Sequence, residues 1–311
     1  MFSPIGIPIS RVVKRFSFLV LPGVMLSVAG CAKVLGATDF PPKGEARTTF
    51  HEIRVGSARR NFLLHRPPPP YGRPLPLLVL LHGSSANANV MMEESGMNAI
   101  ADSLGALVVY PNGTGEIPYF RLFWNETGCC ARPAGVRGVD EEAMLLAIVD
   151  SISRAFPIDR TRMGLAGFSD PGSMAYLIAC DQSEVWTTIG VIAGKLPATT
   201  CGPKRGVSTV VFHGTADHNI RYGSTAADVD AWAQRQRCNA GVMDSTGLVK
   251  TTDYAGCRDG AEVKLYSLIG GRHGWPGGRK SWLLAPSPSR AVDASRVFAN
   301  FVISHPRTAG R

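Results

Sequence analysis

The sequence predicts an α/β fold, a single domain with a mostly parallel central sheet covered by helices on both faces. Three observations support this. Apolar runs of strand length alternate along the chain with helical patterns, which is the order that parallel strands with helical crossovers require. The runs are continuous rather than alternating, as in strands buried on both faces. The 311 residues, 45% hydrophobic and 18% charged, suffice for one large core and do not have the composition of a disordered chain.

Residues 1–31 are predicted to be a signal peptide ending in a lipobox. A basic segment, RVVKR, precedes an apolar stretch of residues 16–30 that is too short, and too broken by Pro22, to span a bilayer comfortably. The stretch ends on VAGC, which resembles a bacterial lipobox, so acyl chains on Cys31 would anchor the mature chain to a membrane. A plain secretory signal cut nearby is the alternative. We therefore expect an extracytoplasmic protein, either lipid-anchored to the outer membrane or cell surface, or secreted.

The domain itself is predicted over residues 48–306, after a flexible tether of residues 32–47 that is rich in Pro, Gly and charge. Residues 48–67 alternate like an antiparallel hairpin around Gly56 and Ser57. The buried strands that follow are predicted at 76–83, 106–113, 162–169, 187–194, 208–214 and 261–270. Helical patterns between them are clearest at 97–105, 140–156, 171–180 and 225–237.

The formal net charge of +9 suggests affinity for anionic surfaces, but Lys and Arg are spread along the chain rather than gathered in blocks. The sequence therefore favours general surface charge, and we expect no nucleic-acid partner.

Six cysteines remain after Cys31, an even number in a compartment where disulfides persist. Fifteen pairings are possible for six cysteines, and the sequence alone does not choose among them. Short intervening segments favour Cys180 with Cys201 and Cys238 with Cys257. The adjacent Cys129 and Cys130 would then form a strained vicinal bridge or stay free.

Three residues follow predicted strands of the parallel sheet, where sites in such sheets form. Ser169 ends one strand and opens a helix, Asp217 follows another in FHGTAD, and His273 follows the last in GGRHGWPGG. Their order along the chain, Ser then Asp then His, is that of the α/β-hydrolase triad.

Each residue type suits a step of nucleophilic catalysis. A serine hydroxyl needs a base within hydrogen-bond reach, and the imidazole of His273 has a suitable pKa to take and return the proton. The Asp217 carboxylate would fix the imidazole tautomer and stabilise the imidazolium. The oxyanion would need two backbone N–H donors, predicted to be Asp170 and, in the earlier LHGSSAN loop, Ser84 or its neighbour Ser85.

Each of these residues has a simpler interpretation when taken alone. Ser169 could be a helix N-cap, Asp217 a turn residue and His273 a solvated side chain. His82 and His213 are expected to pack at strand ends. A metal site at Asp217 with neighbouring histidines is not expected, because no second cluster of ligands accompanies it.

A resemblance supports the catalytic interpretation. Successive blocks of residues 48–303 resemble, in order, the polyhydroxybutyrate depolymerase and feruloyl esterase family of α/β-hydrolases: LLHGSSANAN, VVYPNG, FWNETGCC, GVDEEAMLLAIVD, IDRTRMGLAGFSDPGSMAYLIAC, VFHGTADHNIRYG, RCNA, YAGC and GGRHGWPGG. The resemblance implies Ser169, Asp217 and His273 as the triad and the Ser84 region as the oxyanion loop. It also implies a secreted enzyme without a cofactor, acting on esters of plant-wall phenolics, acetylated sugars or hydroxyalkanoate chains.

The serine motif departs from that family, because Pro171 stands where the family usually has glycine. A ring at this position threatens close packing of the helix on the elbow and could displace Ser169. The first turn of a helix makes no intrahelical use of its N–H groups, however, and the fixed φ of proline suits a helix start. We therefore expect the elbow to form, with activity reduced at most, and the Asp170 carboxylate to point to water.

Aromatic residues are candidates for the substrate pocket. Trp124 and Trp275 are predicted to form its walls, together with Tyr119, Phe120 and Phe123; packing in the core or at the rim is the alternative for each.

These observations predict an exported serine carboxylesterase that acts on hydroxyalkanoate, feruloyl or acetyl esters through an acyl-enzyme. A peptidase of the prolyl oligopeptidase kind shares the fold and the triad order and is the first alternative. A catalytically inactive hydrolase domain that binds a cell-envelope ligand is the second, with Pro171 as its support.

Overall fold

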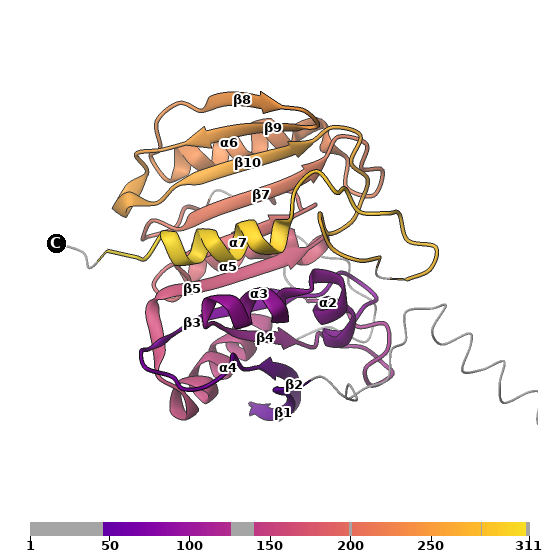
Figure 1. The fold of residues 1–311 in the computed structure, drawn as a ribbon, viewed down its shortest axis with the longest axis vertical. Helices are drawn as coiled ribbons and strands as arrows, with labels where there is room; N and C mark the ends of the chain where they lie inside the picture. The colour runs from indigo at the N-terminus through magenta and orange to yellow at the C-terminus, as the bar shows by residue number, and fades with distance from the viewer. Residues whose placement is uncertain (1–45, 126–139, 199–200, 281, 309–311) are drawn as a thin grey trace, which may run out of the picture.

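Figure 1 shows the computed structural model, which describes residues 46–125, 140–198, 201–280 and 282–308. The predicted signal peptide with Cys31, nearly all of the tether, and both Cys129 and Cys130 lie outside the described residues. The strands of the described part are β1 Thr48–Val55, β2 Ala58–His65, β3 Leu75–Leu81, β4 Leu107–Pro111, β5 Ile158–Phe168, β6 Thr188–Ile192, β7 Ser208–Gly214, β8 Val242–Thr246, β9 Val249–Tyr254 and β10 Val263–Leu268.

These strands form one sheet in the order β1-β2-β4-β3-β5-β6-β7-β10-β9-β8. The six strands from β4 to β10 in that order pair in parallel, so their carboxyl ends meet at the same edge. The predicted leading hairpin is present as β1 and β2, and β2 joins β4 antiparallel. At the other edge β9 and β8 add a second antiparallel hairpin, which was not predicted.

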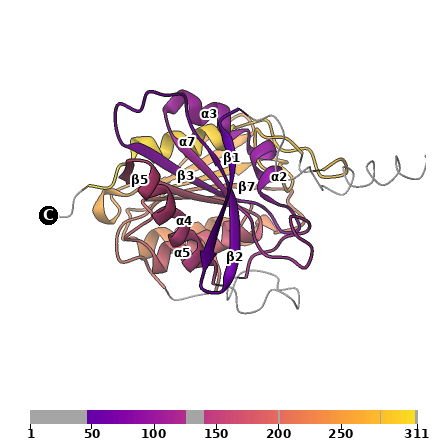
Figure 2. The same ribbon diagram turned by 90° about the horizontal axis from the view of Figure 1, so that it is seen from below.

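Helices cover both faces of the sheet, as Figure 2 shows. One face carries α2 Ala88–Ser95, α3 Met97–Leu104 and α7 Ala294–Ser304, and the other carries α4 Glu141–Ala155, α5 Asp170–Asp181 and α6 Thr225–Arg235. The predicted mostly parallel sheet with helices on both faces is therefore confirmed, although α2 and α7 were not predicted. Among the described residues, no helix combines the length and hydropathy needed to cross a membrane.

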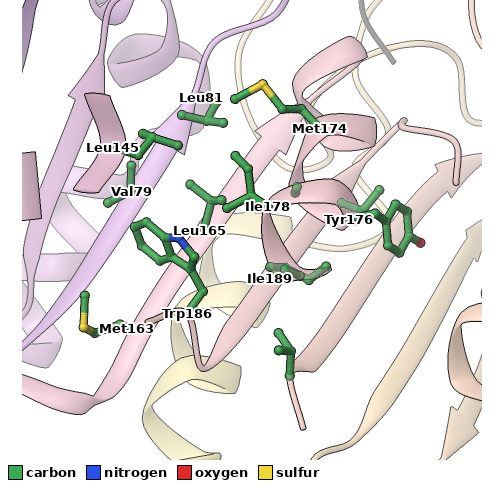
Figure 3. Close-up of a cluster of buried hydrophobic side chains, with 14 of the residues drawn as sticks. Val79, Leu81, Leu145, Met163, Leu165, Met174, Tyr176, Ile178, Trp186 and Ile189 are labelled. Carbon is green, nitrogen blue, oxygen red and sulfur yellow. The ribbon is translucent and has the colours of Figure 1, made fainter. Parts of the chain in front are cut away.

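The larger core holds the central strands in place. In Figure 3, Leu145 of α4 and Ile178 of α5 lie over Val79 of β3 and Leu165 of β5, and all four side chains are almost fully buried. Each such burial stabilises the fold by about 1.5–3 kcal/mol. The strands that precede Ser84 and Ser169, β3 and β5, are thereby fixed relative to one another.

A buried ion pair joins the first hairpin to α4. Arg60 Nη2 lies 2.6 Å from Glu141 Oε2, with the two side chains 6% and 0% exposed. The same nitrogen donates to the backbone oxygen of Asn112 at 3.3 Å. Burial raises the pKa of Glu141, and the neighbouring Arg60 guanidinium opposes that rise. Each charge is thus compensated only as long as its partner is present.

Two disulfides are present in the described residues, Cys180–Cys201 and Cys238–Cys257, which are the two pairings that the short segments favoured. The first joins the end of α5 to the loop after β6, and the second joins the end of α6 to the segment after β9. Both lie around the half of the sheet that carries β6 to β10.

Candidate active site

The carboxyl ends of the parallel strands bring the predicted site residues together. Ser169 follows β5, Asp217 follows β7, His273 follows β10 and Ser84 follows β3. Because these strands are parallel neighbours, the four loops lie at the same edge of the sheet, where sites in such folds form.

Ser169 sits on a sharp turn between β5 and α5. Its φ is 64° and its ψ is −128°, a conformation that L-residues rarely adopt. Its N–H donates to Ile192 O of the neighbouring strand at 2.9 Å, and its carbonyl accepts from Gly172 N–H at 2.9 Å. The turn is therefore held from both sides by backbone hydrogen bonds.

Pro171 is compatible with this turn, because the close approach of helix and strands involves its backbone carbonyl and three glycines. A Cβ at Gly167 would collide with the backbone of Pro171, and one at Gly194 would lie 2.6 Å from the carbonyl carbon of Gly172. Gly172 itself has the backbones of Gly167, Ile192 and Gly194 around it. Pro171 is in the first turn of α5, where its missing N–H leaves no intrahelical bond unmade.

His273 connects the other two residues. Its Nε2 lies 3.1 Å from Ser169 Oγ and its Nδ1 lies 2.7 Å from Asp217 Oδ2. The imidazole is 10% exposed and packs against the ring of Phe168, with ring centroids 4.9 Å apart. The ring is thus placed to exchange a proton with the serine while one face stays shielded from water.

Asp217 is held as a carboxylate. Its Oδ1 accepts from the N–H groups of Asn219 at 2.9 Å and Ile220 at 3.0 Å, and Oδ2 faces His273. Burial alone would raise the pKa of this carboxyl group, but the contacts with His273 and the two amides outweigh it, so the pKa lies below its usual value.

His213 lies beside Asp217 but takes no part in the hydrogen bond between Asp217 and His273. Its Nε2 donates to Ile220 O at 2.8 Å, and its Nδ1 lies 3.1 Å from Thr225 Oγ1. Burial lowers the pKa of His213, so the ring is neutral near pH 7. Both it and His82 pack at strand ends, where they were expected.

The loop after β3 contains both candidate oxyanion donors, Ser84 and Ser85, and their hydrogen bonds distinguish them. Ser85 N–H donates to Leu122 O at 2.8 Å and is therefore occupied. Ser84 N–H makes no hydrogen bond with the described residues, which leaves it available to a ligand. The Ser84 hydroxyl donates to Asp170 Oδ2 at 2.8 Å. The expectation that the Asp170 carboxylate points to water is therefore wrong: it ties the oxyanion loop to the elbow.

His82 holds the same loop in place through hydrogen bonds. The ring is fully buried, and Nε2 accepts from Gly113 N–H at 3.0 Å while Nδ1 lies 2.9 Å from Gly83 O. An acceptor at Nε2 leaves the proton of the neutral ring on Nδ1, which donates to Gly83 O. Desolvation by burial lowers the pKa of His82 to about 4. His82 thus links the end of β3 to the loop after β4 as a neutral group.

A pocket of about 520 Å³ opens beside Ser169 and His273. Trp124 and Trp275 were predicted to line it and do not, because both are 0% exposed. Trp124 Nε1 donates to His82 O, and Trp275 Nε1 donates to Ser295 Oγ, so each indole is anchored in the core.

The pocket is lined by other side chains, of which Phe120 was among the aromatic candidates. Trp282, 44% exposed, is another aromatic lining residue; Arg121 and Glu94 also line the pocket. These three residues could not be predicted from the sequence, since none of them directly follows a predicted strand or belongs to a catalytic motif.

Chemically, the arrangement offers a serine hydroxyl, an imidazole beside it, a carboxylate on the far side of the imidazole and a backbone amide that could bind an oxyanion. Among the described residues, no group of three or more His, Cys, Asp or Glu side chains could hold a metal ion.

Comparison with known proteins gives a family and a set of relatives. The family described as Esterase PHB depolymerase matches residues 61–232, more than half of the chain. NocK of Nocardia uniformis subsp. tsuyamanensis, whose name classes it with the esterases, is 28% identical over 275 residues, which is 76% of either chain. Poly(3-hydroxybutyrate) depolymerase of Ralstonia pickettii is 30% identical over 40% of this chain, but the match spans only 26% of that protein.

Among solved structures, the acetyl xylan esterase from Aspergillus awamori superposes with a TM-score of 0.54. It covers 73% of this chain and 94% of its own, at 12% sequence identity. This likeness concerns the fold, and it confirms the expected α/β-hydrolase architecture.

Proposed function

Because the chain belongs to the esterase family of PHB depolymerases, and is thus a serine hydrolase acting on carboxylic ester bonds, we propose that it cleaves hydroxyalkanoate, feruloyl or acetyl esters through a Ser169–His273–Asp217 triad. The observation that carries the proposal is the continuous hydrogen-bond chain from Ser169 Oγ through both imidazole nitrogens to Asp217. The three residues follow three different strands, so a local turn or helix cap does not explain why they lie within hydrogen-bond distance of one another.

The reaction would begin with attack of Ser169 Oγ on the ester carbonyl while His273 Nε2 takes its proton. Asp217, already ionised and fixed by two amides, stabilises the imidazolium through Nδ1–H. The oxyanion would accept from the N–H groups of Ser84 and Asp170. Collapse expels the alcohol, which receives the proton from His273, and a water molecule then releases the acid from Ser169 by the same steps.

The substrate classes rest on the resemblance of the motif blocks to depolymerases and feruloyl esterases and on the esterase relatives. The pocket is consistent with a small acyl or aryl group, since aromatic and polar side chains line it together. A peptidase of the prolyl oligopeptidase kind remains the rival within the fold.

Export is part of the proposal. The basic segment, apolar stretch and lipobox-like VAGC support a signal peptide with lipidation at Cys31, and no cofactor is invoked. The two disulfides support an oxidising compartment outside the cytoplasm.

The experiment that tests the function compares the protein with Ser169→Ala on short p-nitrophenyl esters and on a prolyl p-nitroanilide, with fluorophosphonate labelling read by mass spectrometry. We expect ester turnover and a label on Ser169, both lost in the variant, and no amide cleavage. Ser245→Ala, at an exposed serine of β8 that lies outside the pocket, is the control for the loss of a hydroxyl. Absence of label and turnover in a folded protein would favour the inactive binding domain instead, and preferential amide cleavage would favour the peptidase.

A further inference from the structure

The pocket beside Ser169 contains a cation that the proposed chemistry does not use. Arg121 lines this pocket, and its side chain makes no ion pair or hydrogen bond with the described residues. It is exposed at the pocket wall, whereas other exposed arginines without such a partner, such as Arg54 and Arg237, lie outside the pocket. A guanidinium in this position is available to an anionic group of a ligand.

The backbone holds Arg121 in an uncommon conformation. Its φ is 52°, and that of Tyr119 is 63°, although neither residue is glycine. Such conformations cost free energy and persist where the surroundings impose them, often at ligand sites. The sequence does not relieve the strain by using glycine or asparagine at position 121.

The surroundings that impose it are parts of the oxyanion loop. Asn87 Nδ2 donates to Tyr119 O at 2.8 Å, and Leu122 exchanges backbone hydrogen bonds with Ser85 and Ala86 at 2.8 and 3.1 Å. The residue after Arg121 is therefore paired with the loop that presents Ser84. The cation is built into the same substructure as the proposed oxyanion site, rather than lying on an independent surface loop.

Charged residues line the pocket from two different segments. Arg121 lines this pocket from the loop before Leu122, whereas buried Glu94 lines it from α2. A carboxylate on the substrate is favoured beside the Arg121 guanidinium.

We propose that Arg121 is a specificity residue that binds a carboxylate carried by the ester substrate, so that the enzyme prefers acid-bearing esters to their neutral counterparts. The inference rests on the proposed esterase function. The carboxylate can belong to the leaving alcohol, as in an ester-linked hydroxyacid dimer, or to the acyl group, as in a monoester of a diacid.

The test measures kcat/KM on two matched pairs with the protein expressed from its full sequence. One pair is the 3-hydroxybutyrate dimer and its methyl ester, and the other is monoethyl and diethyl succinate. The enzyme is compared with Arg121→Gln, Arg121→Lys and Arg121→Asn, the last chosen because asparagine tolerates a positive φ. Arg237→Asn is the control, because Arg237 is also exposed, has φ 60° and lies outside the pocket.

We expect the charged member of one pair to be preferred by about tenfold, a value between those of an exposed and a desolvated ion pair. The pair that shows the preference identifies the side of the ester that carries the carboxylate. Arg121→Gln and Arg121→Asn should abolish the preference through KM, Arg121→Lys should retain part of it, and Arg237→Asn should leave both pairs as in the parent protein. A preference that salt weakens would agree with the ion pair.

A charged-to-neutral ratio that is the same in the parent protein and in Arg121→Gln would overturn the inference while leaving the esterase function intact. Absence of turnover on every ester, neutral ones included, together with no fluorophosphonate label on Ser169, would instead refute the proposed function and this inference with it.

Discussion

At the scale of single residues, the serine turn depends on small neighbours rather than on the residue that departs from the family motif. Ser169 has a positive φ, and the helix behind it can approach the sheet only because Gly167, Gly172 and Gly194 have no side chains. The atoms of Pro171 nearest to that contact are its backbone carbonyl carbon and oxygen, and its place in the first turn of α5 suits the fixed φ of proline. The elbow is therefore compatible with proline at this position.

We expect Pro171→Gly to change kcat/KM by less than about threefold and to lower stability slightly, since glycine loosens the unfolded chain. Gly172→Ala should be far more harmful, because its Cβ would lie 3.0 Å from Gly167 O and 3.1 Å from Ile192 O. Overpacking of this kind costs roughly 1–3 kcal/mol. Urea unfolding and p-nitrophenyl ester assays on both variants check this, and the opposite ranking of the two would refute the account.

His82 leads to a prediction about acid stability. Its pKa is about 4 in the folded protein and near 6.5 in an unfolded chain. Between these values the unfolded state binds a proton that the folded state does not, so the free energy of unfolding falls as the pH drops from 6.5 to 4. The size of this effect is about 3 kcal/mol. The lowered pKa of His213 acts in the same sense, whereas the lowered pKa of Asp217 matters only below its ordinary value of 3.8.

The measurement is urea unfolding at several pH values between 7 and 4 for the protein and His82→Gln, with the exposed His218→Gln as control. The slope of stability against pH should flatten in His82→Gln and not in the control. Equal slopes in all three proteins would contradict the assignment.

The sequence predicted which site residues lie together. It predicted less well which side chains form the surrounding pocket. Ser169, Asp217 and His273 could be found because parallel strands end at one edge, whatever the details of packing. Trp124 and Trp275 were misassigned because an indole next to a site residue in sequence can turn inward, and both find an acceptor in the core. No general rule like the shared edge of parallel strands predicts contacts between loops from sequence, such as the hydrogen bond between Ser84 and Asp170.

At the scale of elements, the burial pattern of each strand or helix decided whether it could be predicted from the sequence. The hairpin β8–β9 was not predicted, because every residue of β8 is exposed. Its sequence therefore lacks the apolar run or alternation that is typical of a strand. Helix α2 was missed for the opposite reason: it is buried on nearly all sides, and polar residues such as Asn89 and Glu94 are buried together with its apolar ones, so the sequence shows no separate apolar face. The strands β3, β5 and β7, buried throughout or over most of their length, were correctly placed.

The ion pair between β2 and α4 provides a test of element docking. Glu141→Leu would leave the Arg60 guanidinium buried without its partner, at a cost of about 3–5 kcal/mol. Adding Arg60→Met should recover much of that loss, because the uncompensated charge disappears. A double-mutant cycle by chemical denaturation measures the coupling. Strictly additive losses would mean that the two side chains do not depend on one another.

At the scale of the whole molecule, the disulfides close loops with sequence separations of 21 and 19 residues. Loops of this length stabilise the folded state by roughly 3 kcal/mol each. We expect reductant to lower Tm, and Cys180→Ala/Cys201→Ala and Cys238→Ala/Cys257→Ala each to reproduce part of that shift. In the quadruple variant, reductant should have no further effect through these pairs. An unchanged Tm of the parent protein in reductant, with thiols counted by mass spectrometry, would contradict this.

The hydrogen bond between Ser169 and His273 joins residues 104 positions apart in the chain. A ribosome adds Ser169 long before it adds His273, and the last parallel strand, β10, must dock before His273 reaches Ser169. The proposed triad therefore cannot be complete in a nascent chain of 272 residues or fewer. On the proposed mechanism, hydrolytic activity arises only once synthesis of the domain is nearly finished.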